Sequence, residues 1–491
     1  MNVAHILETS ARRLPDRTAL VFGDRRLTYA ELDRESGRLA AGLARLGLRP
    51  GDRACLHLAN RPEFVLAYYA CQKLGVTPVA LNVTYVRDEL AYIIRDSGAA
   101  AILSAPPFAA QLPSPGETPS VRWRVGTGDP EGLPFEALAA DPPLRAGDRE
   151  REDVAAILYT SATTGRPKGV MLSHANVVSN VHAVVHHLHM TLDDRGLCAL
   201  PLFHCFGQNF IMNALVAAGG TLVLHERFVP ADFLAAIARH RVTLLYAVPT
   251  MYIVLLSAGF RAHDLSSLRL AFSAAAMLPG DVEQRWTAAT GLPVSQGYGL
   301  TESSPFATYN HEHAHRPGSV GTPVENVEVR VVDEQDREVA DGTLGEIVIR
   351  GPNVMLGYLG KPEDTASVLR GGWLHSGDIG HRDADGYFHV VDRVKDMINV
   401  AGFKVFPREV EEVLFGHPAV AEVAVLGRPD PLKGEVVRAC VVARPGHSAT
   451  AEELVEHCRG RVASYKVPVV VEFLTALPKS PTGKILKKNL R

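Results

Sequence analysis

The chain has 491 residues, with 51 Lys and Arg against 54 Asp and Glu, so its net charge is −3. A balance this near neutral argues against a protein that binds nucleic acid mainly through a basic field. Hydrophobic residues make up 46% and charged residues 21% of the chain, values that exclude disorder as the dominant state and predict a sizeable core. The six cysteines form no C-x-x-C pair, so we expect reduced thiols in a cytoplasmic protein rather than a disulfide or zinc scaffold.

The beginning of the chain has no basic region followed by a long apolar run, so the sequence predicts no signal peptide. Charged residues or Gly break the apolar stretches within about a dozen residues, which is too short to cross a bilayer. We therefore expect no integral membrane segment and no nucleic-acid partner.

The first hundred residues alternate between expected helices and strands. Leu39, Leu43 and Leu46 recur at helical spacing in a helix over residues 33–46, and Gly47 follows as a stop signal. The other elements expected here are a helix over residues 63–74 and strands over residues 53–58 and 99–104. Strands that alternate with helices imply crossover connections and a mainly parallel sheet.

The middle of the chain changes character twice. A Pro-rich stretch over residues 106–148 predicts surface loops with short elements. Apolar strands then resume, with a helix over residues 231–240 and strands over residues 154–158, 221–225, 242–248 and 268–273. After about residue 315 the apolar residues alternate with period two, which predicts short strands over residues 327–332, 345–350 and 387–392.

The last hundred residues predict a separate small unit. Its expected helices cover residues 408–415 and 451–462, and its expected strands cover residues 420–426, 435–443 and 469–474. The sequence therefore predicts an α/β protein with a large N-terminal domain over residues 1–392, built from parallel-type α/β sheets and a β-rich part over about residues 315–392. A small mobile α+β C-terminal domain follows over residues 393–491.

The strongest chemical signal follows the expected strand at residues 154–158. It reads Tyr159-Thr160-Ser161-Ala162-Thr163-Thr164-Gly165-Arg166-Pro167-Lys168-Gly169. A run of hydroxyls and Gly can surround phosphate oxygens with donors, and Lys168 adds a positive charge. A polar turn is the alternative for a hydroxyl run alone. The chain has no Gly-x-x-x-x-Gly-Lys-Ser/Thr, which disfavours a P-loop kinase or ATPase.

This segment resembles the phosphate-binding signature of adenylate-forming enzymes, which include acyl- and aryl-CoA synthetases, firefly luciferase and the adenylation domains of peptide synthetases. Further motifs of that family follow in order and extend the resemblance over essentially the whole chain. They are Pro201-Leu-Phe-His204-Cys-Phe-Gly207, Ser273-Ala-Ala-Ala276, Gln296-Gly-Tyr298-Gly-Leu-Thr301-Glu302, Gly351-Pro-Asn-Val-Met-Leu-Gly-Tyr358, Trp373-Leu-His-Ser-Gly-Asp378, Asp392-Arg393-Val-Lys395-Asp396 and Pro478-Lys-Ser-Pro-Thr-Gly483-Lys484.

The resemblance implies a two-step reaction that uses ATP, Mg²⁺ and CoA or the phosphopantetheine of a carrier protein. A small-molecule carboxylic acid attacks the α-phosphorus of ATP, which gives an acyl-adenylate and pyrophosphate. A thiol then attacks the acyl carbonyl and expels AMP. Two anions must meet in the first step, so the site needs cations and donors directed at the transition state.

The resemblance also implies roles for single residues. Lys484 matches the lysine that bridges carboxylate and α-phosphate, Glu302 the metal-associated glutamate, and Thr301 a hydroxyl on the α-phosphate. Asp378 matches the acceptor of both ribose hydroxyls, since a carboxylate accepts several hydrogen bonds. The full set expected to bind ATP or AMP is Thr160, Ser161, Thr163, Thr164, Gly165, Lys168, Ala274, Ala275, Gln296, Gly297, Tyr298, Gly299, Thr301, Asp378, Arg393 and Lys484, with Tyr298 stacked on adenine.

The acid is expected to bind beside His204, which matches a gate near the carboxylate in CoA ligases. Amino-acid adenylation domains place an Asp near this position, and its absence here disfavours an amino-acid substrate. The expected lining of the acyl pocket is His204, Phe206, Gly207, Met212, Val248, Met251, Met277 and Phe306.

Lys395 stands where the family has the hinge between its two domains. In family members the small domain rotates between the half-reactions, and a hinge needs only a few residues. A solvated lysine in a turn is the alternative for Lys395. Gly402, Phe403 and Lys404 are then expected on the side of the incoming thiol.

Three residues depart from the family pattern, since Ala162, Ala274 and Ala275 stand where Gly is frequent. If the backbone at Ala162 needs a positive φ, the methyl group is strained by roughly 1 kcal/mol. Ala274 and Ala275 are expected to narrow the space around the nucleotide or the acid.

Two histidine-rich segments fall outside these motifs. His182 and His186 have the i, i+4 spacing of a metal pair on an expected helix that also carries His187 and His189. The second segment, His311-Glu312-His313-Ala314-His315, is expected in a loop. Neither segment shows a companion set of ligands in the sequence, so we expect surface or interface clusters rather than metal sites.

The sequence thus predicts an acyl-CoA synthetase of the fatty-acid type. An acyl group delivered to a carrier protein, or an aryl or short-chain acid as substrate, stays open as an alternative. A nucleotide-binding regulator without turnover is disfavoured because Lys168, Glu302, Asp378 and Lys484 are all present. The sequence leaves a homodimer open.

Overall fold

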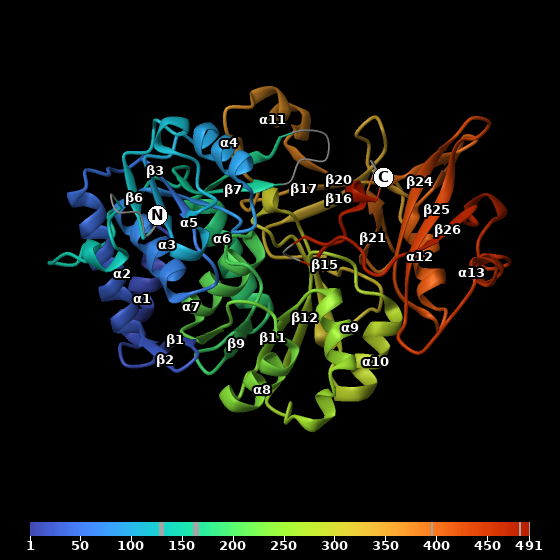
Figure 1. Cartoon of the computed structure of the whole chain (residues 1–491), viewed down its shortest axis with the longest axis horizontal. Helices are drawn as coiled ribbons and strands as arrows, with labels where there is room; N and C mark the ends of the chain where they lie inside the picture. Colours follow the sequence, from blue (N-terminus) through green and yellow to red (C-terminus); the bar gives the residue numbers. More distant parts are fainter. Residues whose placement is uncertain (127–131, 161–165, 394–395, 481–482, 491) are drawn as a thin grey trace.

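The computed structural model describes residues 1–126, 132–160, 166–393, 396–480 and 483–490. It confirms the expected fold class: α/β sheets form the N-terminal part, a β-rich part follows, and a small α+β part ends the chain (Figure 1). The small part, coloured orange to red in Figure 1, lies beside the rest of the molecule. The division at residues 392 and 393 stays a prediction.

The largest sheet has nine strands in the order β15-β14-β13-β12-β11-β9-β10-β1-β2. Its five central pairings are parallel, and antiparallel strands close both edges. The strands are β1 (Thr18–Phe22), β2 (Arg25–Thr28), β9 (Arg195–Cys198), β10 (Thr221–Leu224), β11 (Leu244–Ala247), β12 (Leu270–Ser273), β13 (Val294–Tyr298), β14 (Thr308–Tyr309) and β15 (Thr322–Pro323).

The second sheet has seven strands in the order β18-β8-β7-β4-β3-β5-β6, again with a parallel centre. Its strands are β3 (Arg53–His57), β4 (Thr77–Ala80), β5 (Ala101–Ser104), β6 (Trp123–Val125), β7 (Val154–Thr160), β8 (Lys168–Ser173) and β18 (Gly357–Tyr358). The central strands of both sheets are buried along most of their length, as expected where helices cover both faces of a parallel sheet.

Two antiparallel sheets complete the molecule. The first is the expected β-rich part, with β16 (Glu328–Val332), β17 (Gly345–Arg350), β19 (Leu369–Arg370), β20 (Trp373–Arg382) and β21 (Phe388–Arg393). The second belongs to the C-terminal part, with β22 (Ile398–Val400), β23 (Phe403–Val405), β24 (Val420–Asp430), β25 (Gly434–Ala443) and β26 (Val470–Phe473). The C-terminal part has its own core, which gathers Val405, Val410, Val425, Val441 and Leu454.

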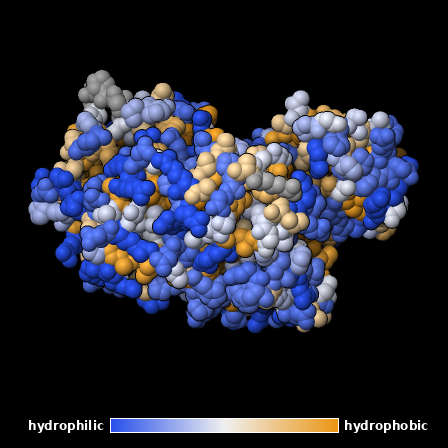
Figure 2. All heavy atoms as spheres, turned by 90° about the horizontal axis from the view of Figure 1, so that it is seen from below, coloured by the Kyte–Doolittle hydropathy of each residue, from blue (hydrophilic) through white to orange (hydrophobic). Residues whose placement is uncertain are grey.

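The helices are amphipathic or buried and pack on these sheets. They are α1 (Ala4–Arg13), α2 (Tyr29–Arg45), α3 (Pro62–Leu74), α4 (Arg87–Ser97), α5 (Pro106–Ala109), α6 (His174–His187), α7 (Ala214–Ala218), α8 (Pro230–His240), α9 (Pro249–Ser257), α10 (Gly280–Thr290), α11 (Pro362–Val368), α12 (Pro407–Phe415) and α13 (Ala451–Cys458). Among the described residues, no helix combines the length and apolarity needed to span a bilayer. Figure 2 shows one face of the molecule as mainly hydrophilic, with hydrophobic residues scattered over it.

Two helix limits differ from the sequence expectation by four residues each, and both differences have local reasons. Helix α2 begins at Tyr29 rather than at residue 33, because the Thr28 hydroxyl accepts the Glu31 N–H and the Glu31 carboxylate accepts the Thr28 N–H. Helix α13 ends at Cys458 rather than at residue 462, since Arg459 turns to extended backbone and Gly460 follows with φ +75°.

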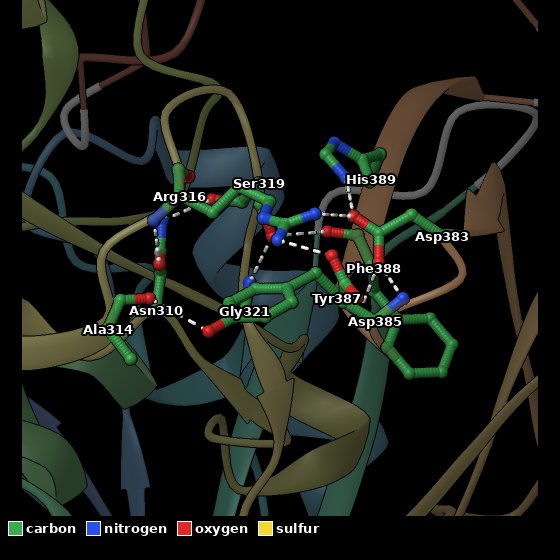
Figure 3. Close-up of polar contacts among 10 residues, drawn as sticks. All are labelled: Asn310, Ala314, Arg316, Ser319, Gly321, Asp383, Asp385, Tyr387, Phe388 and His389. Atoms are coloured by element: carbon green, nitrogen blue, oxygen red, sulfur yellow. Dashed lines mark hydrogen bonds and ion pairs between the residues drawn. The ribbon is translucent and has the colours of Figure 1, made fainter.

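The segment between β14 and β15, residues 310–321, is fastened to the β20–β21 hairpin (Figure 3). Arg316 donates to Asp383 and Asp385 over 2.8 and 2.6 Å, and Tyr387 Oη donates to the carbonyl of Ala314 over 2.8 Å. Asn310 closes the segment on itself by donating to the carbonyls of Arg316 and Ser319. These bonds connect the nine-stranded sheet to the β-rich part that carries Asp378 and Arg393.

Candidate active site

The phosphate-loop motif lies on the β7–β8 hairpin, where Thr160 pairs with Lys168 across the strands. The rest of the expected loop (Ser161, Ala162, Thr163, Thr164 and Gly165) lies outside the described residues. Lys168 Nζ is 2.5 Å from Asp364 Oδ1 and 5.1 Å from the centre of the Tyr358 ring. At the start of β8, Lys168 is therefore already paired with the Asp364 carboxylate.

Glu302 lies within hydrogen-bonding reach of the same tyrosine. Tyr358 Oη donates to Glu302 Oε1 over 2.8 Å, and the Glu302 carbonyl accepts the Met355 N–H. Burial raises the pKa of Glu302 above its usual range. Such a carboxylate gains from a cation that replaces the water it has lost, so it fits the oxygen ligand that Mg²⁺ takes from protein. Thr301, half-buried, precedes it at the start of the turn Thr301–Ser303.

Asp378 is held by two of the other expected nucleotide residues. It is 5% exposed, its Oδ2 accepts from Tyr298 Oη over 2.7 Å, and its Oδ1 accepts from Arg393 Nε over 2.7 Å. The register of the sheet explains the second bond, since Asp378 on β20 pairs with Arg393 on β21. A carboxylate has about four lone-pair positions, so beside these two donors among the described residues it could accept two more hydrogen bonds, as many as a pair of ribose hydroxyls would need.

The ends of β12 and β13 bring together the small residues expected around the nucleotide. Ser273 pairs with Gln296, and the buried Gln296 Nε2 finds no hydrogen-bond partner among the described residues. A side chain on Gly297 would touch the Phe272 ring at 2.6 Å, and one on Gly299 would meet the Pro305 carbonyl at 1.9 Å. These two glycines are therefore required by close packing.

Ala274 and Ala275 follow β12 and lie toward the surface, half-buried and exposed respectively. Ala275 has φ +69°, a left-handed conformation that costs an L-residue about 1–2 kcal/mol. The sequence expectation was that these methyl groups only narrow the site. The structure adds backbone strain at Ala275, the position where the family often has Gly.

Lys484 lies on a tight turn of the C-terminal tail that reaches the N-terminal part. Its N–H donates to Ser480 Oγ, and Gly483 before it has φ +77°. A side chain on Gly483 would meet Thr250 Oγ1 at 2.8 Å and Val248 Cγ2 at 2.9 Å, so the turn docks on the start of α9. Partial loss of hydration, followed by repulsion from Arg393, lowers the pKa of Lys484.

His204 lies half-buried just before the π-helix Phe206–Asn213. Its Nδ1 accepts the Phe206 N–H over 3.2 Å, which leaves Nε2 as the nitrogen that carries the proton in the neutral ring. Burial, followed by the charge of Lys484, lowers the pKa of His204 to about 4. The neutral imidazole donor thus lies near enough to the tail lysine for the lysine charge to act on it.

Behind His204 lies a cluster of aromatic rings. Phe206 and Phe210, four residues apart in the π-helix, meet at 5.2 Å between ring centres. Phe272 lies 4.6 Å from Phe210 and 5.8 Å from Phe206, and Phe306 lies 5.0 Å from Phe210. All four rings are buried.

The other expected pocket residues lie at different depths. Val248 and Met251 are buried at the start of α9, beside the docking point of the tail, and Met277 is half-buried. Met212 is fully buried in the main core. A side chain on Gly207 would meet the Pro201 carbonyl at 2.3 Å, so close backbone packing accounts for this glycine.

Lys395, the expected hinge, lies outside the described residues. Gly402, Phe403 and Lys404 lie on the β22–β23 hairpin, whose turn residues Ala401 and Gly402 both have positive φ. The exposed Phe403 stacks on Tyr465 at 4.7 Å, and Lys404 Nζ is 3.6 Å from Glu334 in the β-rich part.

Two residues that contact the expected site were missed by the sequence reasoning. Tyr358 ends one of the family motifs, so its place in that motif could have indicated a role. Asp364 belongs to no motif, and only the fold brings it to Lys168, 196 positions away in the chain.

The family model of AMP-binding enzymes matches residues 7–359, and that of the AMP-binding enzyme C-terminal domain matches residues 409–484. The chain belongs to the AMP-binding enzyme family. The resemblance to adenylate-forming enzymes is thereby confirmed, and the chain is an AMP-forming CoA ligase that uses ATP.

Relatives in this family include aryl- and fatty-acid-specific ligases. A feruloyl-CoA synthase of Amycolatopsis sp is 42% identical over 98% of this chain and 96% of its own, and a long-chain-fatty-acid–CoA ligase of Bacillus subtilis (strain 168) is 36% identical over 99% and 93%. The structure of an anthranilate CoA ligase in complex with anthranoyl-AMP superposes with a TM-score of 0.95 at 33% identity, over 100% of this chain and 96% of the other.

Proposed function

We propose that this ligase activates a compact aromatic carboxylic acid as its adenylate and transfers the acyl group to CoA. The observation that carries the proposal is the ring cluster of Phe206, Phe210 and Phe272 behind His204. Aromatic rings prefer edge-to-face and offset contacts with other rings, so this wall suits a flat acid. The relatives that act on ferulate and anthranilate support the same class.

A fatty acid, our sequence expectation, is the second candidate. The apolar side chains of Val248, Met251 and Met212 suit an alkyl chain, and methionines adapt their shape more readily than rings. The long-chain ligase of Bacillus subtilis supports it. An apolar pocket separates such acids by only about 1–3 kcal/mol per methylene, so an assay has to rank them.

In the first step the residues of this chain hold two anions together. We propose that the tail turn brings the Lys484 ammonium between the carboxylate and the α-phosphate, where negative charge develops. Asp378 accepts the ribose hydroxyls through its open lone pairs, and the neutral His204 donates from Nε2 toward the acid. Lys168 exchanges Asp364 for phosphate oxygens.

Mg²⁺ would be held by Glu302 together with phosphate oxygens, and it would supply neutralisation of phosphate charge. The half-buried carboxylate, with its raised pKa, is the feature that fits the ion. In the second step the thiol attacks the acyl carbonyl and AMP leaves. We propose that the C-terminal part then turns about Lys395, so that the hairpin with Gly402, Phe403 and Lys404 faces the incoming pantetheine.

The test is pyrophosphate release over a panel of benzoate-type, cinnamate-type, short-chain and long-chain acids. The panel is then repeated for thioester formation with CoA and with a holo carrier protein. We expect the highest kcat/KM for an aromatic acid with CoA. A preference for long-chain acids would replace the first candidate by the second, and faster transfer to the carrier protein would overturn CoA as acceptor.

A paired substitution tests the wall itself. Phe206→Ala removes a ring next to His204 and should shift kcat/KM toward longer acids. Phe233→Ala removes a buried ring that packs on Phe228 instead, and serves as the matched control for lost core packing. Equal acid preferences in both variants would contradict the role of Phe206.

A further inference from the structure

The fold brings the two histidine-rich segments of the chain together. His189 follows the end of α6, and Glu312 and His313 begin the short turn Glu312–Ala314 in the segment between β14 and β15. One ligand atom from each of His189, Glu312 and His313 lies within 4.8 Å of the other two. Each segment therefore supplies metal ligands that the other segment lacks on its own.

We propose that His189, Glu312 and His313 form a binding site for a divalent transition-metal ion, with Zn²⁺ as the expected ion. Two imidazoles and one carboxylate suit Zn²⁺ and its neighbours in the series, whereas Mg²⁺ prefers oxygen ligands alone. Bonds of about 2.0–2.2 Å to one ion require ligand atoms nearer than 4.8 Å, so the side chains close slightly around it. Three protein ligands leave a fourth position for water.

The carboxylate is held in place by an outer group. Tyr309 Oη donates to Glu312 Oε2 over 2.8 Å, which fixes one oxygen, while the other accepts no hydrogen bond among the described residues and can face an ion. Outer hydrogen bonds of this kind orient metal ligands and raise their affinity. On the far side of the turn, Tyr387 Oη holds the carbonyl of Ala314 (Figure 3). The turn that carries Glu312 and His313 is thus fixed at both ends.

The backbone of His189 is also held. It adopts φ +47°, an uncommon conformation for a residue other than Gly, and its carbonyl accepts from Arg269 Nη2 over 3.2 Å. The charge of Arg269 is balanced, since its Nε and Nη2 donate to the two oxygens of Asp194 over 2.8 Å each. The arginine therefore positions the histidine with its own charge already paired.

Two further histidines, His187 and His311, lie near the proposed ligands but are not part of the site. His187 Nε2 accepts the Glu325 N–H over 2.9 Å, so that nitrogen is already engaged. His311 lies 5.0 Å from His313 between ring centres, and its buried Nδ1 finds no hydrogen-bond partner among the described residues. His189 and His313 are exposed and Glu312 half-buried, so an ion can reach the site directly from solvent.

An ion here would connect the end of α6 to residues 310–321. That segment is fastened to the β20–β21 hairpin by Arg316 and Tyr387 (Figure 3), and β20 carries Asp378. Binding to the folded chain alone adds stability that grows with the free ion concentration. A metal ion at this site would therefore stabilise the attachment of residues 310–321 to the β-rich part. It would be a different ion from the Mg²⁺ proposed at Glu302.

The test titrates Zn²⁺ into the full-length chain without an affinity tag by calorimetry, and records the Co²⁺ absorption spectrum and the thermal midpoint. We expect one ion per chain, a Co²⁺ spectrum with nitrogen and oxygen ligands, and a raised midpoint. His189→Gln and His313→Gln should each weaken binding by about tenfold or more, and Tyr309→Phe by about tenfold.

His447→Gln is the matched control, because this histidine is exposed and its side chain contacts only the nearby Pro445 carbonyl among the described interactions. It should bind Zn²⁺ like the wild type. The six cysteines are buried, so thiols do not compete in the folded chain. Unchanged titrations of His189→Gln and His313→Gln, or no uptake by the wild type, would overturn the site.

Discussion

Asp378 and Arg393 face each other across β20 and β21, and Arg393 Nε donates to Asp378 Oδ1 over 2.7 Å. Arg393 is the last residue of β21, and Lys484 of the tail lies near enough for the two cations to repel each other. The residue expected to bind ribose is thus built into the same strand pair that leads into the small C-terminal part.

Asp378→Ala should therefore affect both stability and nucleotide binding. It leaves the Arg393 guanidinium and the Tyr298 hydroxyl without their acceptor, which costs about 1–3 kcal/mol of the free energy of unfolding. It also removes the expected ribose contact and should raise the KM for ATP. Urea unfolding and an ATP titration measure the two effects. The double variant Asp378→Ala with Arg393→Ala should lose less stability than the two single variants lose together. A loss equal to that sum would contradict the interaction between the two residues.

Lys484→Ala should separate the two half-reactions. The ammonium is proposed to act only where charge develops on the α-phosphate, so acid-dependent pyrophosphate release should fall by about 10²–10³-fold. Attack of CoA on a supplied acyl-adenylate should be largely kept. The exposed Lys488 on the same tail gives the matched control, Lys488→Ala. Equal losses in both steps for Lys484→Ala would remove the assigned role.

Ala275→Gly should cost no stability, unlike an ordinary Ala-to-Gly change. Removal of the methyl group relieves a left-handed strain of about 1–2 kcal/mol, which offsets the roughly 0.4–1 kcal/mol lost through a more flexible unfolded chain. The exposed Ala276, whose φ is not positive, is the control, and Ala276→Gly should lower the free energy of unfolding by roughly 0.5–1 kcal/mol. Chemical denaturation compares them, and a larger loss for Ala275→Gly would contradict the strain.

Local patterns predicted most of the fold, and the resemblance to adenylate-forming enzymes predicted the class of reaction. Alternating helices and strands predicted the parallel sheets because each crossover returns the chain to the same sheet. The motif containing Tyr298 begins within β13, and the one containing Lys168 begins within β7 and ends within β8, so short sequences marked the strand ends where the polar groups collect. The start of α2 was also readable, since Thr28 and Glu31 form a capping box that the helix prediction overlooked.

The remaining contacts depend on the packing of distant elements. Tyr358 bonds to Glu302 across 56 positions, and Lys168 meets Asp364 across 196. No local spacing encodes such pairs, because the arrangement of the sheets decides them. The same holds for His189 and His313, which each looked like part of an isolated surface cluster until the fold placed them together.

Acid should destabilise the chain through its buried histidines, and His57 offers the simplest case. It is fully buried on β3, 3.2 Å from Ser104 Oγ, and burial lowers its pKa to about 4, against about 6.5 in the unfolded chain. Between these values the unfolded state binds more protons, so the free energy of unfolding decreases as the pH falls through this range.

His57→Asn can keep the bond to Ser104 without the titration and should flatten this dependence by roughly 3 kcal/mol at the acid end. The exposed His447→Asn should leave the slope as in the wild type. Urea unfolding between pH 7 and 4 measures the pH dependence of the free energy of unfolding. These limits span the pKa of His57 in the unfolded chain, about 6.5, and in the folded chain, about 4. A slope in His57→Asn identical to the wild type would show that another group controls it.

The tail turn with Lys484 docks on the start of α9. We propose that this arrangement serves adenylation and that the turn has to leave before a thiol can reach the adenylate. The chain enters the C-terminal part between β21 and β22, in the segment that contains Lys395, so we expect the proposed rotation to occur there. Lys395→Pro restricts φ there and should spare acid-dependent pyrophosphate exchange while suppressing thioester formation. Lys395→Ala, which removes the charge but keeps the backbone free, is the control and should form thioester normally. Normal thioester formation by Lys395→Pro would mean that the rotation occurs elsewhere or is not needed.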